Sequence, residues 1–537
     1  MIRMHIIALG AVLTLVAAAS ATANAPQANG PPVAIDPAIA PPLSPSTEAS
    51  HSREPAANSS AATSPVASAL RAKIAALPND GSAQELKERA VLSEFYAARH
   101  DAPLWLSEAG LTDKGSAIIA EFQKAGDWGL NPKDFTLPEV APGTLDPAVI
   151  ADTDVTLSLA VLKYARYARG GRIIDPTILL NSNLDRKPQL IDPEIVIKGA
   201  ADAGEPDVYL RGLNPKQPQF EKLRQAYLSA KNKPIAKKLL ANMEEWRWMP
   251  DDLGDVHIMA NVPEFMVYLV KKDEVIHTER IVVGETGKQT TIFSRPLKTI
   301  VFKPLWRVPE SIKVRELQSN LLRGGSMFRQ YDLQLETKDG EPLDYRSIDW
   351  RTADIRNYEV VQPPGRKNVM GVVKFTFPSQ HTIFMHDTVD KWMFANGVRT
   401  LSHGCLRLRN PMRMAELVLA EDKGWDAAKV QATMSEGPRN NEIIIEHKIP
   451  MHLVYFTAWV GDDGKVRTFR DIYGHEKRIT QALDGKWDEI DVGRDHLAPV
   501  EDAQPSAIDA PGAVARLRRN SEPTIIDIVG NALGNGF

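Results

Sequence analysis

The residues most capable of chemistry surround the single cysteine of the chain, Cys405. His403 stands two residues before it, and His386 lies further upstream. The thiolate is the nucleophilic form of cysteine, and a free thiol with a pKa near ~8.5 is mostly protonated at neutral pH. An imidazole that takes this proton, held in place by a third group, would activate the sulfur. These residue types predict covalent catalysis by a cysteine.

The segments that carry these residues read as two short strands. Residue types alternate over 401–409, so an extended chain would turn the polar side chains to one face and leucines such as Leu406 to a core. Residues 382–386 are rich in β-branched, aromatic and apolar types, which predicts a second strand. If the two strands are neighbours, His386 can lie beside Cys405.

The alternation also places Arg407 on the face of the cysteine, where a guanidinium suits a substrate that carries a carboxylate. Gly404 would let a substrate approach the backbone closely. The N–H groups of Gly404 and Cys405 are therefore the predicted donors to an oxyanion. His381 is expected to be a solvent-facing strand residue.

The segment Ser402–Arg407 (SHGCLR), with His-Asp-Thr upstream at 386–388, resembles the signature of the L,D-transpeptidases, the YkuD-type catalytic domain. That family carries a His, then about fifteen residues, then Ser/Thr-His-Gly-Cys. The resemblance implies that Cys405 is the nucleophile and His386 the general base. It also implies that the backbone carbonyl of Asp387 orients the base.

By the same resemblance, His403 and Arg407 shape the site, and Phe384 stands where family members often have a tyrosine. The predicted substrate-binding residues are Arg407, Phe384, Ser402, Arg399, Trp306 and Asn368. A lone cysteine can also be a small buried hydrophobe, and the histidines with Cys405 could bind zinc. No HExxH or CxxC motif is present, so neither a metal nor another cofactor is predicted.

Composition limits the classes of protein. A length of 537 residues allows two to four domains, and 43% hydrophobic residues suffice for a real core. With 64 Lys and Arg against 68 Asp and Glu, the net charge is −4, which gives no basic excess for nucleic acid. A single cysteine also excludes an intramolecular disulfide.

The N-terminus reads as an export signal. Residues 1–23 combine Arg3, an apolar run and a small-residue cleavage site, which predicts a cleaved signal peptide and a periplasmic protein. The alternative is an uncleaved anchor, but the run is shorter than the roughly 20 residues that span a bilayer. Residues 24–66 are dense in Pro, Ala and Ser and predict a disordered linker.

The rest predicts an α+β, multi-domain protein. Residues 67–232 show helical spacing, with Thr112 as a helix cap and a helix end at 170–171, and they resemble the helical scaffold domain of the large periplasmic (YcbB-like) L,D-transpeptidases. Closely spaced β-rich runs over 240–475 predict a mainly β catalytic domain. Its insertion at about 310–365 resembles a capping subdomain and is predicted to act as a lid. Residues 476–537 are expected to be a disordered tail.

The resemblance implies a peptidoglycan L,D-transpeptidase. Such an enzyme forms a Cys thioester on a stem tetrapeptide, releases D-Ala and makes a 3→3 crosslink. The acceptor could be a stem diaminopimelate, the amine of an outer-membrane protein, a free D-amino acid or water, and carbapenems are the expected inhibitors. Two alternatives stay open: a cysteine peptidase that trims stem peptides, and a noncatalytic wall-binding protein.

Overall fold

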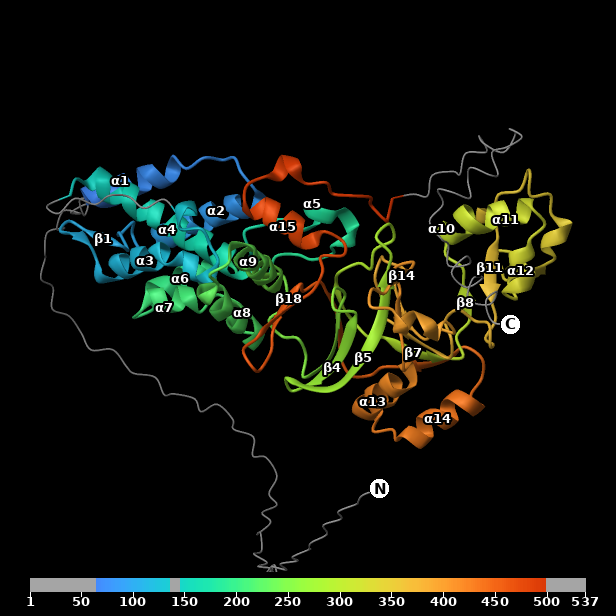
Figure 1. Ribbon diagram of the computed structural model, residues 1–537. Helices are drawn as coiled ribbons and strands as arrows, with labels where there is room; N and C mark the ends of the chain where they lie inside the picture. Colours follow the sequence, from blue (N-terminus) through green and yellow to red (C-terminus); the bar gives the residue numbers. More distant parts are fainter. Residues whose placement is uncertain (1–63, 136–144, 499–537) are drawn as a thin grey trace, which may run out of the picture. The chain divides into compact units, whose positions relative to one another are not determined.

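The computed structural model describes residues 64–135 and 145–498 (Figure 1). The predicted signal peptide and nearly all of the predicted linker therefore lie outside the described residues. Within the described residues, no helix is long and apolar enough to cross a membrane.

The first part of the described chain is helical, as predicted. Its helices are α1 (Pro65–Ala75), α2 (Ala83–Ala98), α3 (Asp113–Gln123), α4 (Pro147–Gly170), α5 (Thr177–Leu180), α6 (Pro193–Asp202), α7 (Pro206–Arg211), α8 (Pro218–Ser229) and α9 (Lys233–Arg247). Local sequence explains where several begin. Ser82 and Glu85 form a capping box on α2, and the Thr112 side chain accepts from the Gly115 N–H at the start of α3, as the sequence predicted.

Helix α4 is the central element of this region. It ends at Gly170, and Gly171 follows with a φ of +92°, a backbone conformation that favours glycine. Asp154 on α4 is fully buried, and its carboxylate accepts the backbone N–H groups of Leu104, Trp105 and Leu106. Because three donors converge on one carboxylate, this side chain fixes the loop after α2 against the helix.

The second part is a mainly β domain with a strongly curved sheet (Figure 1). Its sheet has the order β16-β7-β12-β13-β15-β5-β4-β3-β17-β6, and β14 pairs with the end of β5. The strands are β3 (Val256–Asn261), β4 (Met266–Lys271), β5 (Glu274–Gly284), β6 (Ser294–Pro296), β7 (Thr299–Phe302), β12 (Val373–Thr376), β13 (Met385–His386), β14 (Thr400–Ser402), β15 (Leu406–Leu408), β16 (Asn441–Ile444) and β17 (Pro450–Val454).

Two helices after the sequence motif pack on the sheet: α13 (Pro411–Lys423) and α14 (Ala427–Glu436) (Figure 1). They contribute Met414, Val418 and Val430 to the same buried cluster as Leu406 and Leu408 of β15. The predicted alternation is therefore confirmed on its apolar side, because both leucines are fully buried in this core.

The predicted insertion has a hydrophobic cluster of its own, centred on residues such as Leu317, Phe328 and Val360. Its small sheet has the order β10-β9-β11-β8. Its elements are β8 (Trp306–Arg307), α10 (Glu310–Ile312), a π-helical turn (Lys313–Leu317), α11 (Gln318–Leu322), α12 (Ser326–Gln330), β9 (Gln334–Glu336), β10 (Pro342–Leu343) and β11 (Glu359–Gln362).

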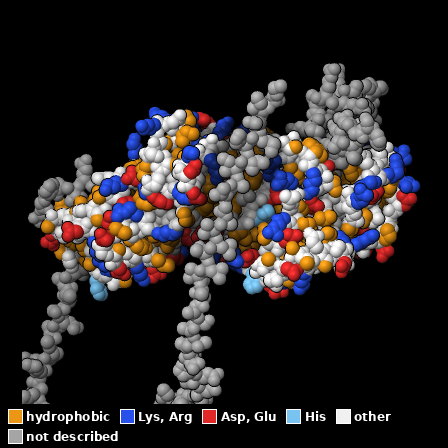
Figure 2. Space-filling view, turned by 60° about the horizontal axis from the view of Figure 1, so that its bottom comes forward, with side chains coloured by type: hydrophobic (Ala, Val, Ile, Leu, Met, Phe, Trp, Pro, Cys, Tyr) orange, Lys and Arg blue, Asp and Glu red, His pale blue; other side chains and the backbone are white. Residues whose placement is uncertain are grey.

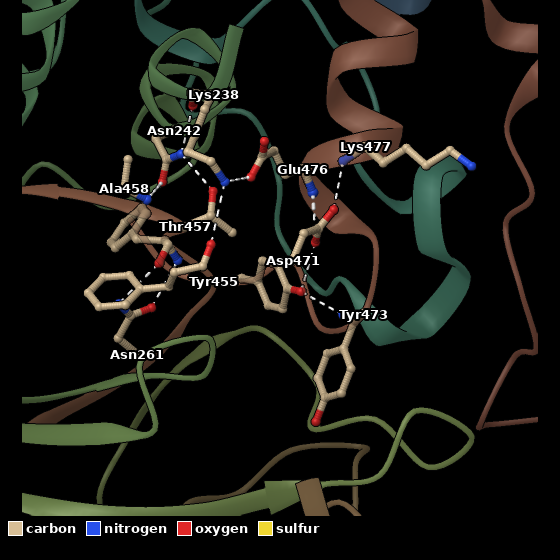
Figure 3. A network of polar contacts seen from close by, with 12 residues as sticks. Lys238, Asn242, Asn261, Tyr455, Thr457, Ala458, Asp471, Tyr473, Glu476 and Lys477 are labelled. Carbon is tan, nitrogen blue, oxygen red and sulfur yellow. Dashed lines mark hydrogen bonds and ion pairs between the residues drawn. The ribbon is translucent and has the colours of Figure 1, made fainter. Parts of the chain in front are cut away.

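The expectation of a disordered tail from residue 476 is wrong for residues 476–498. Helix α15 (His475–Leu483) buries Ile479 and Ala482 in the core of the sheet domain. Figure 3 shows how Asp471 holds its start: the carboxylate accepts the Tyr455 hydroxyl and the backbone N–H groups of Glu476 and Lys477. The apolar face of this helix is short, and its partners lie far away in sequence. Residues 499–537 lie outside the described residues.

Candidate active site

Strands β13 and β15 run side by side in parallel, with His386 opposite Arg407. This register places Cys405, just before β15, level with Phe384. A cavity of about 410 Å³ opens over the two strands, and both Cys405 and His386 line it. The tertiary fold therefore brings the two predicted catalytic residues to one cavity.

Hydrogen bonds fix the loop that carries Cys405. The Ser402 hydroxyl donates to the Cys405 carbonyl (2.6 Å) and accepts the Gly404 N–H (3.2 Å). The Thr290 hydroxyl donates to the Gly404 carbonyl (2.7 Å). Gly404 has a φ of +111°, which a residue with a side chain adopts only with strain. These three hydrogen bonds hold the loop in the observed conformation.

These bonds correct two predictions. The Gly404 N–H is already bound to Ser402, so it is not a free oxyanion donor. The Ser402 hydroxyl is consumed in the same loop and holds the backbone rather than a substrate. Within residues 64–135 and 145–498, no hydrogen bond engages the Cys405 N–H, which leaves it as the remaining backbone donor beside the sulfur.

His386 is held as a neutral base. Its Nδ1 lies 2.5 Å from the Asp387 carbonyl oxygen, and because a carbonyl only accepts, Nδ1 carries the hydrogen. Nε2 is then unprotonated and able to accept a proton. Burial, and next the positive charge of Arg407, lower the pKa of His386 to about 3.

Cys405 is half-buried, and burial raises the pKa of its thiol. Its Sγ lies 3.8 Å from the Thr382 carbonyl and 3.5 Å from the Phe384 nitrogen, whose N–H it accepts. In the described part of the chain, no hydrogen bond joins Sγ to His386. Catalytic hydrogen bonds of unliganded enzymes are often long and shorten only with substrate bound.

His403 connects the loop that carries Cys405 to the insertion. Its Nε2 lies 2.9 Å from Glu316 Oε1, on the π-helical turn, and 2.6 Å from Lys288 Nζ. A carboxylate only accepts and an ammonium only donates. The His403 Nε2 can therefore bond to Glu316 when it carries the hydrogen, and to Lys288 when it does not. Sequence reasoning missed Lys288 and Glu316, because neither belongs to the motif.

Three predicted substrate-binding residues are used inside the protein instead. Arg407 is 2% exposed and pairs with Asp390 (3.4 Å), although its Nε is buried without a partner. The Arg399 guanidinium donates to three backbone carbonyls, including that of Phe265. The Asn368 side chain is buried and bonds only to backbone groups, such as the Pro304 carbonyl.

The two remaining residues that were predicted to bind substrate, Trp306 and Phe384, lie in different places. Trp306 lines the cavity. Phe384 contributes its backbone N–H to the sulfur, and its ring lies under the Lys374 ammonium (4.9 Å). His381 is not solvent-facing as expected. It is buried, stacked on Phe293 and bonded to Asp185, a contact over 196 residues that no local pattern could reveal.

No group of three or more His, Cys, Asp or Glu side chains in the described ranges is arranged to hold a metal ion. The zinc alternative therefore has no ligand set around Cys405. The remaining geometry is that of a half-buried thiol and a neutral imidazole that share one cavity.

Comparison with known proteins agrees with this arrangement. Residues 90–226 match the scaffold domain family, and residues 255–431 match the L,D-transpeptidase catalytic domain. A putative L,D-transpeptidase of Haemophilus influenzae is 25% identical over 421 residues, which cover 75% of this chain and 81% of that protein. The chain thus carries an L,D-transpeptidase catalytic domain preceded by a scaffold domain, and it is similar to a putative L,D-transpeptidase.

Proposed function

We propose that this protein forms 3→3 crosslinks in peptidoglycan through a thioester on Cys405. The observation that carries the proposal is that the only cysteine of the chain and a neutral histidine with a free Nε2 line the same cavity. The match to the L,D-transpeptidase catalytic domain and the likeness to a putative L,D-transpeptidase support acyl transfer on peptidoglycan.

The first half-reaction makes the thioester. His386 Nε2 takes the thiol proton, and the Cys405 sulfur attacks the carbonyl carbon of diaminopimelate, the third residue of a stem tetrapeptide. The Cys405 N–H is the backbone donor proposed for the oxyanion. When the tetrahedral intermediate collapses, the bond to D-Ala breaks, and the leaving amine takes the proton from His386.

The second half-reaction releases the enzyme. The side-chain amine of a second diaminopimelate attacks the thioester carbonyl and gives a proton to His386. The carbon–sulfur bond breaks, the new amide forms the crosslink, and the sulfur regains its proton. The amine of an outer-membrane protein or a free D-amino acid would react in the same way.

The pKa directions support one way of activating the proposed nucleophile. Burial raises the pKa of the Cys405 thiol and lowers that of His386, so the resting pair is a neutral thiol and a neutral imidazole. Proton transfer is then coupled to attack on the substrate rather than complete before binding. This favours general-base catalysis over a preformed thiolate–imidazolium pair.

We assign the insertion the role of a lid over the donor. Trp306, Ile312 and Glu316 of the insertion line the cavity, and Glu316 contacts His403 of the motif. Exclusion of water would favour an amine over water as acceptor, which separates a transpeptidase from a peptidase. From the signal-peptide prediction and the proposed wall substrate, we propose that the mature protein acts in the periplasm.

The test is intact-mass analysis after incubation with a carbapenem, whose reactive carbonyl the cysteine should attack. We expect the wild type to gain one inhibitor mass and Cys405→Ala to gain none. An adduct on Cys405→Ala, or none on the wild type, would contradict the assigned nucleophile. Muropeptide analysis then separates the alternatives: crosslinked dimers support the transferase, shortened monomers the peptidase, and unchanged peptides the wall-binding protein.

A further inference from the structure

The cavity over Cys405 has an excess of positive charge. Five cationic side chains line it, namely Lys288, Arg315, Arg407, Arg478 and Arg494, against the single carboxylate of Glu316. The protein as a whole has a net charge of −4, and Figure 2 shows basic and acidic side chains interspersed over the face that it presents. The cationic excess is therefore a local property of the cavity.

Three of these cations already have partners. Lys288 pairs with Glu285 and lies 3.7 Å from Glu316. Arg407 pairs with Asp390. The Arg478 guanidinium donates to backbone carbonyls, including that of Asp491. These side chains are engaged by other groups of the protein, although the Arg407 Nε is buried without a partner.

Arg315 and Arg494 are different. Both side chains are exposed, and neither has a hydrogen bond or ion pair to another residue of the described ranges. They reach the cavity from separate segments: Arg315 from the π-helical turn of the insertion, and Arg494 from the chain after α15.

The backbone under each arginine is nevertheless fixed. The turn under Arg315 buries Val314 and Leu317 in the core of the insertion. The Arg494 carbonyl accepts the Asn183 side-chain N–H (3.0 Å).

The two residues after Arg494 are tied down as well. Asp495 bonds to the Ser182 hydroxyl, and His496 bonds to His381 (2.8 Å). An anchored backbone that carries an unpaired guanidinium lowers the entropic cost of binding an anion.

We propose that Arg315 and Arg494 bind carboxylates of the donor stem peptide and so make the segment 491–498 part of the donor site. This inference rests on the proposed function, because the tetrapeptide supplies the anions: the terminal carboxylate of D-Ala, the side-chain carboxylate of diaminopimelate and the α-carboxylate of D-glutamate. A guanidinium fits a carboxylate with two parallel hydrogen bonds, which lysine cannot reproduce.

The experiment measures kcat/KM of the full chain and of Arg315→Gln and Arg494→Gln with four donors. The first donor is the tetrapeptide, and each of the other three lacks one of its carboxylates. A C-terminal amide removes the carboxylate of D-Ala, lysine in place of diaminopimelate removes the side-chain carboxylate, and D-isoglutamine in place of D-glutamate removes the α-carboxylate. We expect each variant to lose about 10- to 100-fold on the tetrapeptide, mainly through KM. Each variant should match the wild type on one analogue only, namely the analogue that lacks the carboxylate bound by the replaced arginine.

Arg323→Gln and Arg470→Gln are matched controls, since both side chains are exposed and lie outside the cavity. Unchanged kinetics of Arg315→Gln and Arg494→Gln, or an equal loss on all four donors, would overturn the inference. Failure of the proposed function looks different: the wild type itself would then form no crosslinked dimers from the tetrapeptide.

Discussion

The floor and the rim of the cavity are built in opposite ways. At the floor, polar groups around Cys405 are paired with one another: Ser402 and Thr290 hold its loop, and Asp387 holds the imidazole. At the rim, Arg315 and Arg494 stand on anchored backbone with no partner in the described part of the chain.

This difference separates two tasks. A reaction centre gains from groups that are already oriented, because little reorganisation is then left for the transition state. A site for a flexible, charged peptide needs unpaired groups that the ligand itself can satisfy. We therefore expect changes at the floor to lower kcat and changes at the rim to raise KM.

The largest expected effect is at the floor. Cys405→Ala removes the proposed nucleophile, and kcat should fall by about 10⁴-fold or more, because no other thiol exists in the chain. The measurement is release of D-Ala from a tetrapeptide, with thermal unfolding as a check of the fold. Retention of more than a few per cent of the activity would rule out a thioester on this residue.

Replacement of the base should have the next largest effect. His386→Ala removes the acceptor of the thiol proton, and we expect kcat to fall by about 10²- to 10⁴-fold with little change in KM. His447→Ala is a control, since His447 is exposed and does not line the cavity. A rise in KM with unchanged kcat would place His386 in binding rather than in catalysis.

The pH profile tests the neutral state of the base. Since the pKa of His386 is lowered to about 3, its imidazole stays unprotonated as the pH falls from 8 to 5. We expect no acidic limb of kcat/KM near pH 6.5, and a decrease only as the pH approaches the folded-state pKa. An inflection near 6.5 that disappears in His386→Ala would show an ordinary, solvated histidine.

The loop that carries Cys405 should tolerate substitutions less well than the small size of its side chains suggests. Ser402→Ala removes two hydrogen bonds from the turn at Gly404, each worth about 1 kcal/mol. Displacement of the sulfur should lower kcat by about 10- to 100-fold, whereas Ser435→Ala on the outside of α14 should have no effect. Unchanged kcat in Ser402→Ala would show that the loop is held without this hydroxyl.

The smallest effect is expected where the rim meets the floor. Glu316→Gln removes the negative charge beside Lys288 and His403, and we expect KM to change by about two- to five-fold with kcat nearly constant. Glu310→Gln, exposed on the same insertion, is the matched control. A large fall in kcat in Glu316→Gln would show that this residue of the insertion acts in catalysis. It would then contradict the division between a floor that sets kcat and a rim that sets KM.

Sequence patterns worked best where a single segment carries the information. The alternation around Cys405 correctly assigned Leu406 and Leu408 to the core, and the cap at Thr112 correctly began a helix. The same patterns could not identify what a polar side chain bonds to. Arg399 was predicted to bind substrate, yet one of its partners is the Phe265 carbonyl, 134 residues away.

By itself, the sequence indicated the L,D-transpeptidase resemblance, the α+β class and the motif that contains Cys405 and His386, because each depends on residue types at short spacing. Only the tertiary structure decided that Arg407 is buried against Asp390, that His381 is internal, and that Arg494 and its neighbours Gly493 and His496 reach the cavity. The physical reason is that a charge or a hydrogen-bond donor is free or used according to neighbours that arrive from distant parts of the chain.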